Sequence, residues 1–446
     1  MEITLGLTTE VHELGGLLRG MAGAWAAGDE GYDEAEAAKL RHRAIELCHT
    51  HYHRTIPAYR RLCEDAGVGD EASLDTIVEL CMVTDSVFKS YDSAWVDGGN
   101  FAAMGEWLAD ICAEPVPPAP AEAANVDDWL ARLEEGGLHV LYSSGTSGKL
   151  SFVPRAEDSW NSYRANGPSY LMHRVIDLGV ELPSMHGAVL GFRGGRMGAQ
   201  RAGVELARLI PSVQFLYDHE IRAEMLRTIL SERRQDEARA TRRATEAAWS
   251  DGRESSYERF LAGLGEATAR DMSVWLFGSP YQVKQLCRLA ISTQTPPLLP
   301  GSVVSLGGGW KSFEGERITR DELAELIERA MGITSERVLE AYSMVELNTP
   351  MMSCREKRFH VPPIVEPVAM DEGLFPLPRG HDVAGEFGFL DPTCTSFPSF
   401  LVTGDQVRLT WSCPCGLSGP AIAGEITRAP GREVRGCGGV MATMRA

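Results

Sequence analysis

The sequence lacks the features that would place the protein in a membrane, on a secretory route or on nucleic acid. It contains no run of about eighteen apolar residues, the length needed to cross a bilayer. The first residues, MEITLGLTTEVHELGG, have neither a basic segment nor a long apolar core of signal-peptide type. Lys and Arg number 43 against 62 Asp and Glu, whereas a protein that binds a phosphate backbone needs a basic surface. We therefore expect a cytoplasmic protein with neither a membrane nor nucleic acid as a partner.

Cysteine is too sparse for a disulfide framework, with ten in 446 residues. In a reducing compartment, grouped cysteines indicate metal or thiol chemistry instead. The composition is 44% hydrophobic and 24% charged, which is typical of a globular chain. The length is sufficient for a large core with several subdomains.

Helical and strand-like patterns occupy different parts of the chain. Helical periodicity runs through residues 11–66, and the Pro/Ala-rich stretch EPVPPAPAEAA predicts a linker. Short apolar runs that end in small residues, such as LHVLYSS and MSVWLFGS, then alternate with helical stretches such as RDELAELIERAMG, which predicts an α/β fold with a largely parallel sheet. We predict an N-terminal helical region and linker over 1–130, a core over 131–430 and a tail over 431–446.

Three histidines, His49, His51 and His53, lie within the helical region. Their spacing of two fans the rings around a helix, so that only His49 and His53 share a face. Spaced histidines alone are weak support for a metal site, and we assign them no function.

A glycine-rich loop follows a predicted strand in LYSSGTSGKLSFVPR. Its hydroxyls, backbone amides and single ammonium group suit the phosphates of a nucleotide. It is not a Walker A loop, because that motif needs glycine at 143 and Ser or Thr at 150, where this chain has Ser143 and Leu150. A P-loop kinase is therefore disfavoured. The candidate phosphate-binding residues are Ser143, Ser144, Gly145, Thr146, Ser147, Gly148 and Lys149.

Three further segments follow this loop along the chain. A glycine run lies in SLGGGWKS, a Tyr-x-x-x-Glu pattern in AYSMVELN, and Thr-Gly-Asp in LVTGDQVRL. In this order the four motifs resemble the adenylate-forming superfamily of acyl-CoA synthetases, peptide-synthetase adenylation domains and luciferases. The resemblance implies the α/β fold of the superfamily's N-terminal domain, with mixed, largely parallel sheets flanked by helices. The nucleotide-binding residues that it adds are Gly307, Gly308, Gly309, Tyr342, Ser343, Met344, Glu346, Asp405 and Arg428.

The resemblance also implies a role for each motif in the binding of ATP. Tyr342 would stack on the adenine, and Asp405 would accept hydrogen bonds from the ribose hydroxyls. Glu346 and the Thr146 hydroxyl would hold Mg²⁺, a hard cation that prefers oxygen ligands. Arg428 would contact ribose or phosphate. Catalysis would then be mainly positioning and charge neutralisation, to which Lys149 contributes.

The loop departs from the superfamily pattern after Lys149, where Leu150-Ser151-Phe152 replaces Pro-Lys-Gly. Only ten residues follow Gly436, the glycine of the hinge motif, so we expect that the usual mobile C-terminal domain is missing. The lysine that this domain supplies in most members would then have to be replaced by Lys149 or by a partner, unless the core works alone.

Three passages resemble the LuxE-type acyl-protein synthetases of bioluminescence operons, namely VTDSVFKS, GGGWKSFEGERITRDELAELI and GREVRGCGG. In that family the acyl group passes from acyl-AMP to a cysteine near the C-terminus, and Cys437 stands in the matching Arg-Gly-Cys position. A thiolate is a good acceptor when its pKa is lowered, and Arg432 and Arg435 are close in sequence. The alternative for Cys437 is an incidental tail cysteine.

Other functions stay open at this point. Adenylating enzymes of phenazine antibiotic biosynthesis have the same shortened form, so an aromatic acid is an alternative to a fatty acid, with an amine or a carrier protein as acceptor. A carrier protein or a reductase is a candidate partner, and a homo-oligomer is compatible with the sequence. A catalytically degenerate member that acts as a complex partner is the non-enzymatic alternative, and the presence of Lys149, Glu346 and Asp405 speaks against it.

A second set of cysteines lies between the Tyr-x-x-x-Glu motif and the hinge. Cys354 and His360 lie in MMSCREKRFHVPP, and Cys413 and Cys415 lie in WSCPCG. Three thiolates and one imidazole are a sufficient tetrahedral set for structural Zn²⁺. The order resembles a Cys, His, Cys-x-Cys pattern of some phenylacetate-CoA-ligase-like proteins. The alternative is that these cysteines are buried and simply pack.

Overall fold

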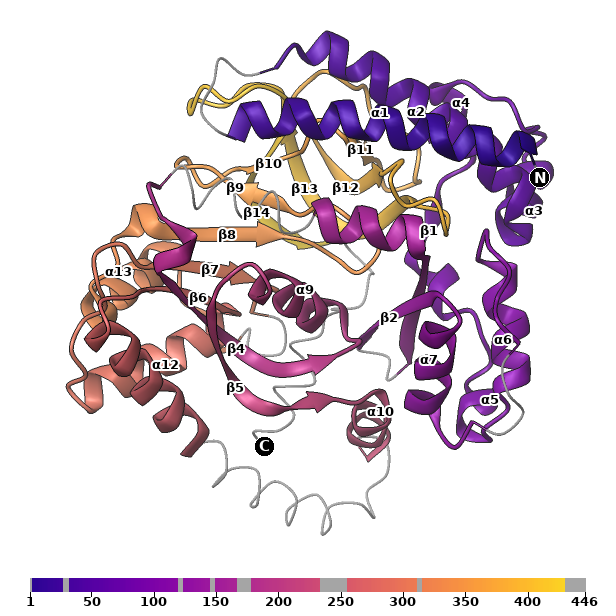
Figure 1. Cartoon of the computed structure of the whole chain (residues 1–446). Helices are drawn as coiled ribbons and strands as arrows, with labels where there is room; N and C mark the ends of the chain where they lie inside the picture. The colour runs from indigo at the N-terminus through magenta and orange to yellow at the C-terminus, as the bar shows by residue number, and fades with distance from the viewer. Residues whose placement is uncertain are drawn as a thin grey trace. The chain divides into compact units, whose positions relative to one another are not determined.

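The computed structural model of the chain describes residues 2–26, 32–118, 123–144, 149–166, 178–232, 255–310 and 315–429 (Figure 1). The chain divides into two compact units, which we call unit 1 and unit 2. Unit 1 comprises Met1–Leu141, Ser151–His173 and Met344–Glu433, and unit 2 comprises Tyr142–Leu150, Arg174–Ser343 and Val434–Ala446. Among the described residues, no helix is both long and apolar enough to span a bilayer.

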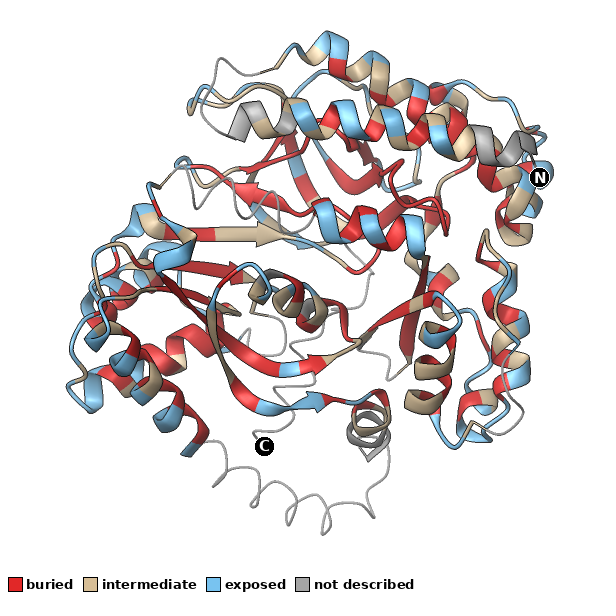
Figure 2. Ribbon diagram, viewed as in Figure 1, coloured by how far each residue is buried: buried red, intermediate tan, exposed pale blue. Residues whose placement is uncertain are grey.

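Unit 2 is built on a parallel sheet whose strands pair in the order β5-β4-β6-β7-β8. The strands are β4 Met185–Gly195, β5 Ser212–Ile221, β6 Ser273–Gly278, β7 Val303–Gly307 and β8 Val338–Tyr342. Parallel strands are normally covered on both faces, and β4, β6 and β7 are largely buried (Figure 2). The sheet expected from the alternating pattern is therefore present.

Helices connect these strands. They are α9 Gly198–Ala207, α10 Ala223–Glu232, a helix over 255–269, α12 Pro280–Ser292 and α13 Arg320–Met331, with the short 3-10 turns Leu182–Ser184 and Ser335–Arg337. The ends of α13 follow from its sequence. Thr319 caps its first turn reciprocally with Glu322, and Gly332 ends it in the left-handed conformation, with φ 73°.

Unit 1 holds an antiparallel sheet in the order β11-β12-β13-β14-β10-β9. The strands are β9 Met351–Ser353, β10 Phe359–His360, β11 Glu366–Met370, β12 Val383–Leu390, β13 Phe400–Thr410 and β14 Ala421–Arg428. A short parallel strand, β1 Val83–Thr84, pairs with β13. The chain passes from unit 1 to unit 2 within β2, Leu138–Ser144, and returns within its pairing partner β3, Leu150–Ala156.

The N-terminal region of unit 1 is helical, as its periodicity predicts. Its helices are α1 Glu2–Ala26, α2 Glu34–Thr55, α3 Pro57–Asp65, α4 Leu74–Leu80, α5 Ser93–Asp97, α6 Phe101–Asp110 and α7 Val126–Glu135, with the 3-10 turn Asp85–Lys89. Helix α2 packs on β11, where the buried Arg41 donates to Glu366 Oε2 at 2.6 Å and to the Pro363 carbonyl at 2.7 Å. Tyr52 and Tyr59 pack with Phe400 of β13. The helical region is thus joined to the sheet by both charge and aromatic packing.

Candidate functional site

In unit 2, two of the sequence motifs meet at the carboxyl edge of the parallel sheet. Gly307 ends β7 beside Ala341 of β8, and Tyr342 ends β8. Gly308 and Gly309 have φ of 83° and 62°, so the chain turns away from the sheet in a conformation that favours glycine. Tyr342 is half-buried. Ligands of α/β sheets bind at such carboxyl ends, which makes this edge of unit 2 a candidate nucleotide site.

The start of the serine/glycine loop reaches the same edge of unit 2. The Tyr142 amide donates to the Arg196 carbonyl at 3.0 Å, just beyond the end of β4. The Tyr142 hydroxyl donates to the Ile221 carbonyl at the end of β5, at 3.1 Å. Ser143 and Ser144 therefore leave β2 at the carboxyl edge, and Lys149 is half-buried immediately before β3. The predicted residues Gly145, Thr146, Ser147 and Gly148 lie outside the described residues.

In unit 1, the structure pairs the predicted ribose-binding aspartate with the predicted hinge arginine. Asp405 of β13 and Arg428 of β14 are register partners, and their side chains form an ion pair at 2.8 Å. Gly404 has a φ of 75° and its carbonyl accepts from the Ala429 amide at 3.1 Å. The Asp405 amide donates to the Thr403 hydroxyl at 3.1 Å. The Thr-Gly-Asp motif therefore lies within β13, and the backbone of this strand is kinked at Gly404.

Glu346 of unit 1 is buried, with 6% of its surface exposed. Burial raises the pKa of its carboxyl, and the positive charges of Arg155, Lys89 and Arg428 oppose that rise. A buried carboxyl of this kind ionises more readily when a further cation is near. Met344 is half-buried at the start of the same segment, and Ser343 is exposed at the adjoining end of unit 2.

Arg155, which lies in β3 and is fully buried, was not among the residues predicted from the sequence. Its Nε donates to the side-chain oxygen Oδ1 of Asn348 at 3.0 Å and its Nη2 to the Val345 carbonyl at 2.6 Å, so it contacts residues on both sides of Glu346. Its guanidinium lies 4.8 Å from the ring centroid of Tyr163 and 5.0 Å from that of Phe397. A lone arginine in a short strand forms no pattern, so sequence reasoning had no signal for it.

A buried polar network continues from this arginine. The Asn348 amide donates to Asp391 Oδ2 at 3.1 Å, and the Thr393 hydroxyl donates to Asp391 Oδ1 at 2.6 Å. Burial raises the pKa of Asp391, and these hydrogen bonds act in the opposite direction. Asn166 donates to the hydroxyls of Thr349 and Thr393 at 3.0 and 3.2 Å. The network ties the segment that carries Glu346 to the loop before β13.

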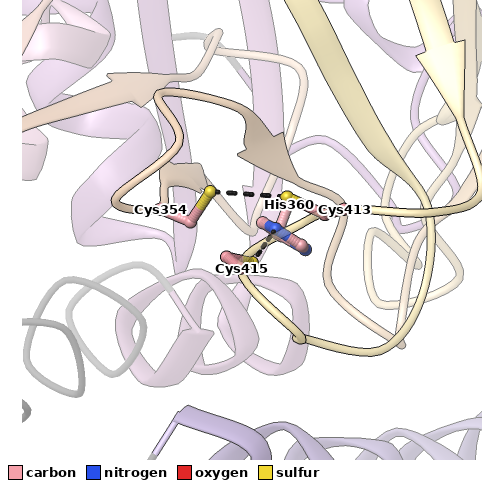
Figure 3. Close-up of side chains that lie close together, drawn as sticks. All are labelled: Cys354, His360, Cys413 and Cys415. Atoms are coloured by element: carbon pink, nitrogen blue, oxygen red, sulfur yellow. Dashed lines mark hydrogen bonds between the residues drawn. The ribbon is translucent and has the colours of Figure 1, made fainter.

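The four predicted zinc ligands are brought together in unit 1 (Figure 3). Their ligand atoms all lie within 4.8 Å of one another, with Cys354 Sγ 3.7 Å from Cys413 Sγ and Cys415 Sγ 3.3 Å from His360 Nε2. Burial alone would raise the pKa of the Cys354 thiol. Hydrogen bonds from His360 and from the backbone of Arg358 outweigh burial and lower this pKa from 9.0 to about 6. The Leu417 amide donates to Cys415 Sγ at 3.4 Å, as is common around metal-bound sulfur.

The predicted acyl acceptor, Cys437, lies outside the described residues, together with Arg432 and Arg435.

Part of the sequence is similar to known proteins. Residues 252–445 match the family model of the acyl-protein synthetase LuxE. The chain is 31% identical over 156 residues to a long-chain-fatty-acid–luciferin-component ligase of Vibrio harveyi, which covers 34% of this chain and 40% of that protein. It is 28% identical over 159 residues to the ligase of the same name from Aliivibrio fischeri, and this match covers 35% of this chain and 41% of that protein. The chain thus spans about 40% of the length of these relatives.

Among solved structures, the fold is similar to an open conformation of 2-hydroxyisobutyryl-CoA ligase in complex with 2-HIB-AMP and CoA. The TM-score is 0.54 at 16% sequence identity, over 88% of this chain and 70% of that chain. This likeness confirms the fold class. The matches to the two luciferin-component ligases and to the family model confirm the resemblance to LuxE-type proteins, which the family model places over residues 252–445.

Proposed function

We propose that this chain, which is related to the acyl-protein synthetase LuxE over residues 252–445, is an adenylate-forming ligase. It activates a carboxylic acid with ATP to acyl-AMP, releases pyrophosphate and passes the acyl group to a thiol. The observation that carries the proposal is in unit 2, where the glycine turn 307–309, Tyr342 and the start of the serine/glycine loop share one carboxyl edge of a parallel sheet. That edge is where α/β proteins bind nucleotides.

The reaction needs no strong base. A carboxylate oxygen of the acid attacks the α-phosphorus of ATP, and the bond between that phosphorus and the oxygen bridging to the β-phosphorus breaks, so that pyrophosphate leaves. Lys149 neutralises phosphate charge at the loop, Tyr342 presents a flat face to the adenine, and Asp405 accepts from the ribose hydroxyls. Arg428, which is paired with Asp405, would contact the ribose or a phosphate.

Mg²⁺ fits the residues of this proposal. Glu346 is a buried carboxyl whose ionisation burial disfavours, and a hard cation that bridges phosphates would favour its charged form. Glu346 and the Thr146 hydroxyl would hold the ion, which supplies charge neutralisation for the departing pyrophosphate. The chain's own contribution is to keep Glu346 in place, through the hydrogen bonds of Arg155 to Val345 and Asn348.

The test is exchange of labelled pyrophosphate into ATP across a panel of fatty and aromatic acids. We expect exchange with at least one acid class, and a loss of exchange in Glu346→Gln. The exposed Asp97→Asn serves as the control and should exchange like the wild type. A folded protein that exchanges pyrophosphate with no acid of the panel would instead be the degenerate complex partner, and the proposal would be wrong.

The same assay decides between the two substrate classes. A fatty acid agrees with the luciferin-component ligases, whose name states a long-chain fatty acid. An aromatic acid would favour a role in antibiotic biosynthesis, with an amine or a carrier protein as acceptor. A cytoplasmic location and a carrier or reductase partner are part of the proposal, and homo-oligomerisation is compatible with it.

Cys437 is the proposed acceptor of the acyl group. Its thiolate attacks the carbonyl carbon of acyl-AMP, a thioester forms, and AMP leaves with the electron pair of the broken carbon–oxygen bond. Intact-protein mass spectrometry after incubation with ATP and the acid should show one acyl adduct that hydroxylamine removes. Cys437→Ala should lose the adduct, whereas Cys287→Ala, which removes a buried thiol of α12, should keep it. An adduct that persists in Cys437→Ala refutes this role.

We further propose that Cys354, His360, Cys413 and Cys415 hold a structural zinc ion. A shared zinc, with Zn–S of about 2.3 Å and Zn–N of about 2.0 Å, would set sulfurs about 3.8 Å apart and sulfur and nitrogen about 3.5 Å apart. The separations of 3.7 and 3.3 Å in the structure are close to these values. The ion would fasten the turn between β9 and β10 to the loop before β14, which carries Arg428. Protein purified without chelator that contains no zinc by elemental analysis would overturn this assignment.

A further inference from the structure

A second group of metal-ligating side chains lies in the helical region of unit 1, and none of its members belongs to the sites described above. It comprises His49 of α2, Cys63 of α3 and Cys81, the residue that follows α4. All three are fully buried, and their ligand atoms lie within 4.8 Å of one another. We propose that these residues, with the Tyr59 hydroxyl beside them, form a second structural zinc site.

The hydrogen bonds of His49 fix the tautomer that a metal requires. Its Nε2 lies 2.9 Å from the Gly69 carbonyl, which can only accept, so Nε2 carries the proton. Its Nδ1 therefore presents a lone pair. A metal-bound imidazole characteristically donates its other N–H to a backbone carbonyl or a carboxylate, as here. The ring is thus oriented and in the correct protonation state for binding through Nδ1.

The lone pair of His49 faces the hydroxyl of Tyr59 at 2.9 Å. The thiols of Cys63 and Cys81 lie within 4.8 Å of each other and of a ring nitrogen of His49, and Tyr59 belongs to the same helix, α3, as Cys63. Two sulfurs, one nitrogen and one phenolic oxygen consequently converge from three helical segments. Neither thiol forms a disulfide.

The chemistry of the donors favours zinc over the other common ions. Thiolate and imidazole are ligands of Zn²⁺ and Cu⁺, whereas Mg²⁺ and Ca²⁺ take oxygen ligands. Zinc bound to the thiolates of Cys63 and Cys81 and to a neutral imidazole has no net charge, which suits a buried site. Cu⁺ in the same place would leave one uncompensated negative charge in the core. Each thiol loses its proton to solvent as the Zn–S bond forms, so binding releases protons.

The site also has the dimensions that zinc needs. Tetrahedral zinc sets its sulfur and nitrogen ligands about 3.5 to 3.8 Å apart. The ligand atoms of this cluster, all within 4.8 Å of one another, need to approach by at most about 1.3 Å. The ion would join α2 and α3 to the residue after α4, next to the packing of Tyr59 on Phe400. Its role would be to hold the helical region together, as closed structural sites do.

The test counts zinc on the full-length chain purified without chelator. We expect about two zinc ions per wild-type chain and about one in Cys63→Ser, Cys81→Ser, Cys413→Ser or Cys415→Ser. Cys287→Ala, the loss of a buried thiol outside both clusters, should retain about two. If Cys63→Ser and Cys81→Ser each bind as much zinc as the wild-type chain, the proposal is wrong.

A measurement on the wild-type chain covers the case in which the cysteine variants do not fold. After exchange of zinc for ¹¹³Cd, the NMR spectrum should show separate signals for a site with three sulfurs and a site with two. A spectrum without the two-sulfur signal would overturn the proposal. An intact mass two hydrogens below that of the fully reduced chain, with Cys63 and Cys81 joined in a disulfide, would also overturn it. The result is independent of the proposed ligase activity, since neither readout uses ATP or an acid.

Discussion

Replacing Glu366 with Gln removes the charge to which Arg41 ties helix α2. The carboxylate is buried, with 9% of its side chain exposed, and lies 2.6 Å from the guanidinium of Arg41. Burial raises the pKa of Glu366, but the hydrogen bond from His42 and the charges of Arg41 and His42 outweigh it and lower that pKa from 4.5 to about 2. At about 1.4 kcal/mol per pH unit, this difference corresponds to about 3 kcal/mol of folding free energy at neutral pH.

The sign of the pH dependence follows from the lowered pKa. The stabilisation is fully present above the unfolded-state pKa near 4.5 and is lost as the pH falls toward about 2. Urea denaturation followed by circular dichroism should therefore show Glu366→Gln less stable than the wild type at pH 7, with the difference shrinking steadily below about pH 4.5. Glu79→Gln, which alters an exposed carboxylate of α4, should behave like the wild type throughout.

Two results would refute this reasoning. One is a Glu366→Gln chain as stable as the wild type at pH 7. The other is a deficit of the same size at pH 7 and near pH 2.5, because a loss of packing alone does not titrate.

Three further perturbations bear on the sites. Asp405→Asn keeps the shape of the side chain but removes the charged acceptor, so the KM for ATP in pyrophosphate exchange should rise about 10- to 100-fold, and an unchanged KM would contradict the ribose role. Arg155→Leu removes one of the three cations near buried Glu346, together with both hydrogen bonds of the guanidinium, and should lower the free energy of unfolding by about 3 to 5 kcal/mol, measured with urea. Arg155→Lys should recover only part of that loss, since lysine cannot make both hydrogen bonds; full recovery would show that charge alone matters. Treatment with a zinc chelator should lower the thermal midpoint, with Zn²⁺ and not Mg²⁺ restoring it; no change would argue against structural zinc.

The parts of the fold that could be predicted from the sequence are those with regular patterns. The parallel strands of unit 2 are short apolar runs between helical stretches, and α13 carries its own capping signals at Thr319 and Gly332. The antiparallel sheet of unit 1 had weaker signals, because β9 and β10 have only three and two residues, too few for alternation to be read. The pairing of strands so short depends on the rest of the sheet.

The candidate sites follow the same division. The Cys354 cluster was predictable because its members lie close in sequence in two pairs. Asp405 and Arg428 could each be selected because they stand in recognisable motifs, but their ion pair was not predicted. Arg155 was not predictable, since its partners at 345 and 348 lie far along the chain. The sequence also placed His49 beside other histidines, whereas its thiol neighbours, Cys63 and Cys81, come from separate helical segments.

Asp405 lies in the middle of β13, an eleven-residue strand paired to β12 on one side and β14 on the other. A side chain on a central strand is held more rigidly than one on a loop tip, and Gly404 supplies the local kink that aims it. An arriving nucleotide would therefore meet an acceptor that needs no ordering of its own. Little conformational entropy would be lost at this contact, and the orientation of the Asp405 side chain should be the same with and without a bound nucleotide.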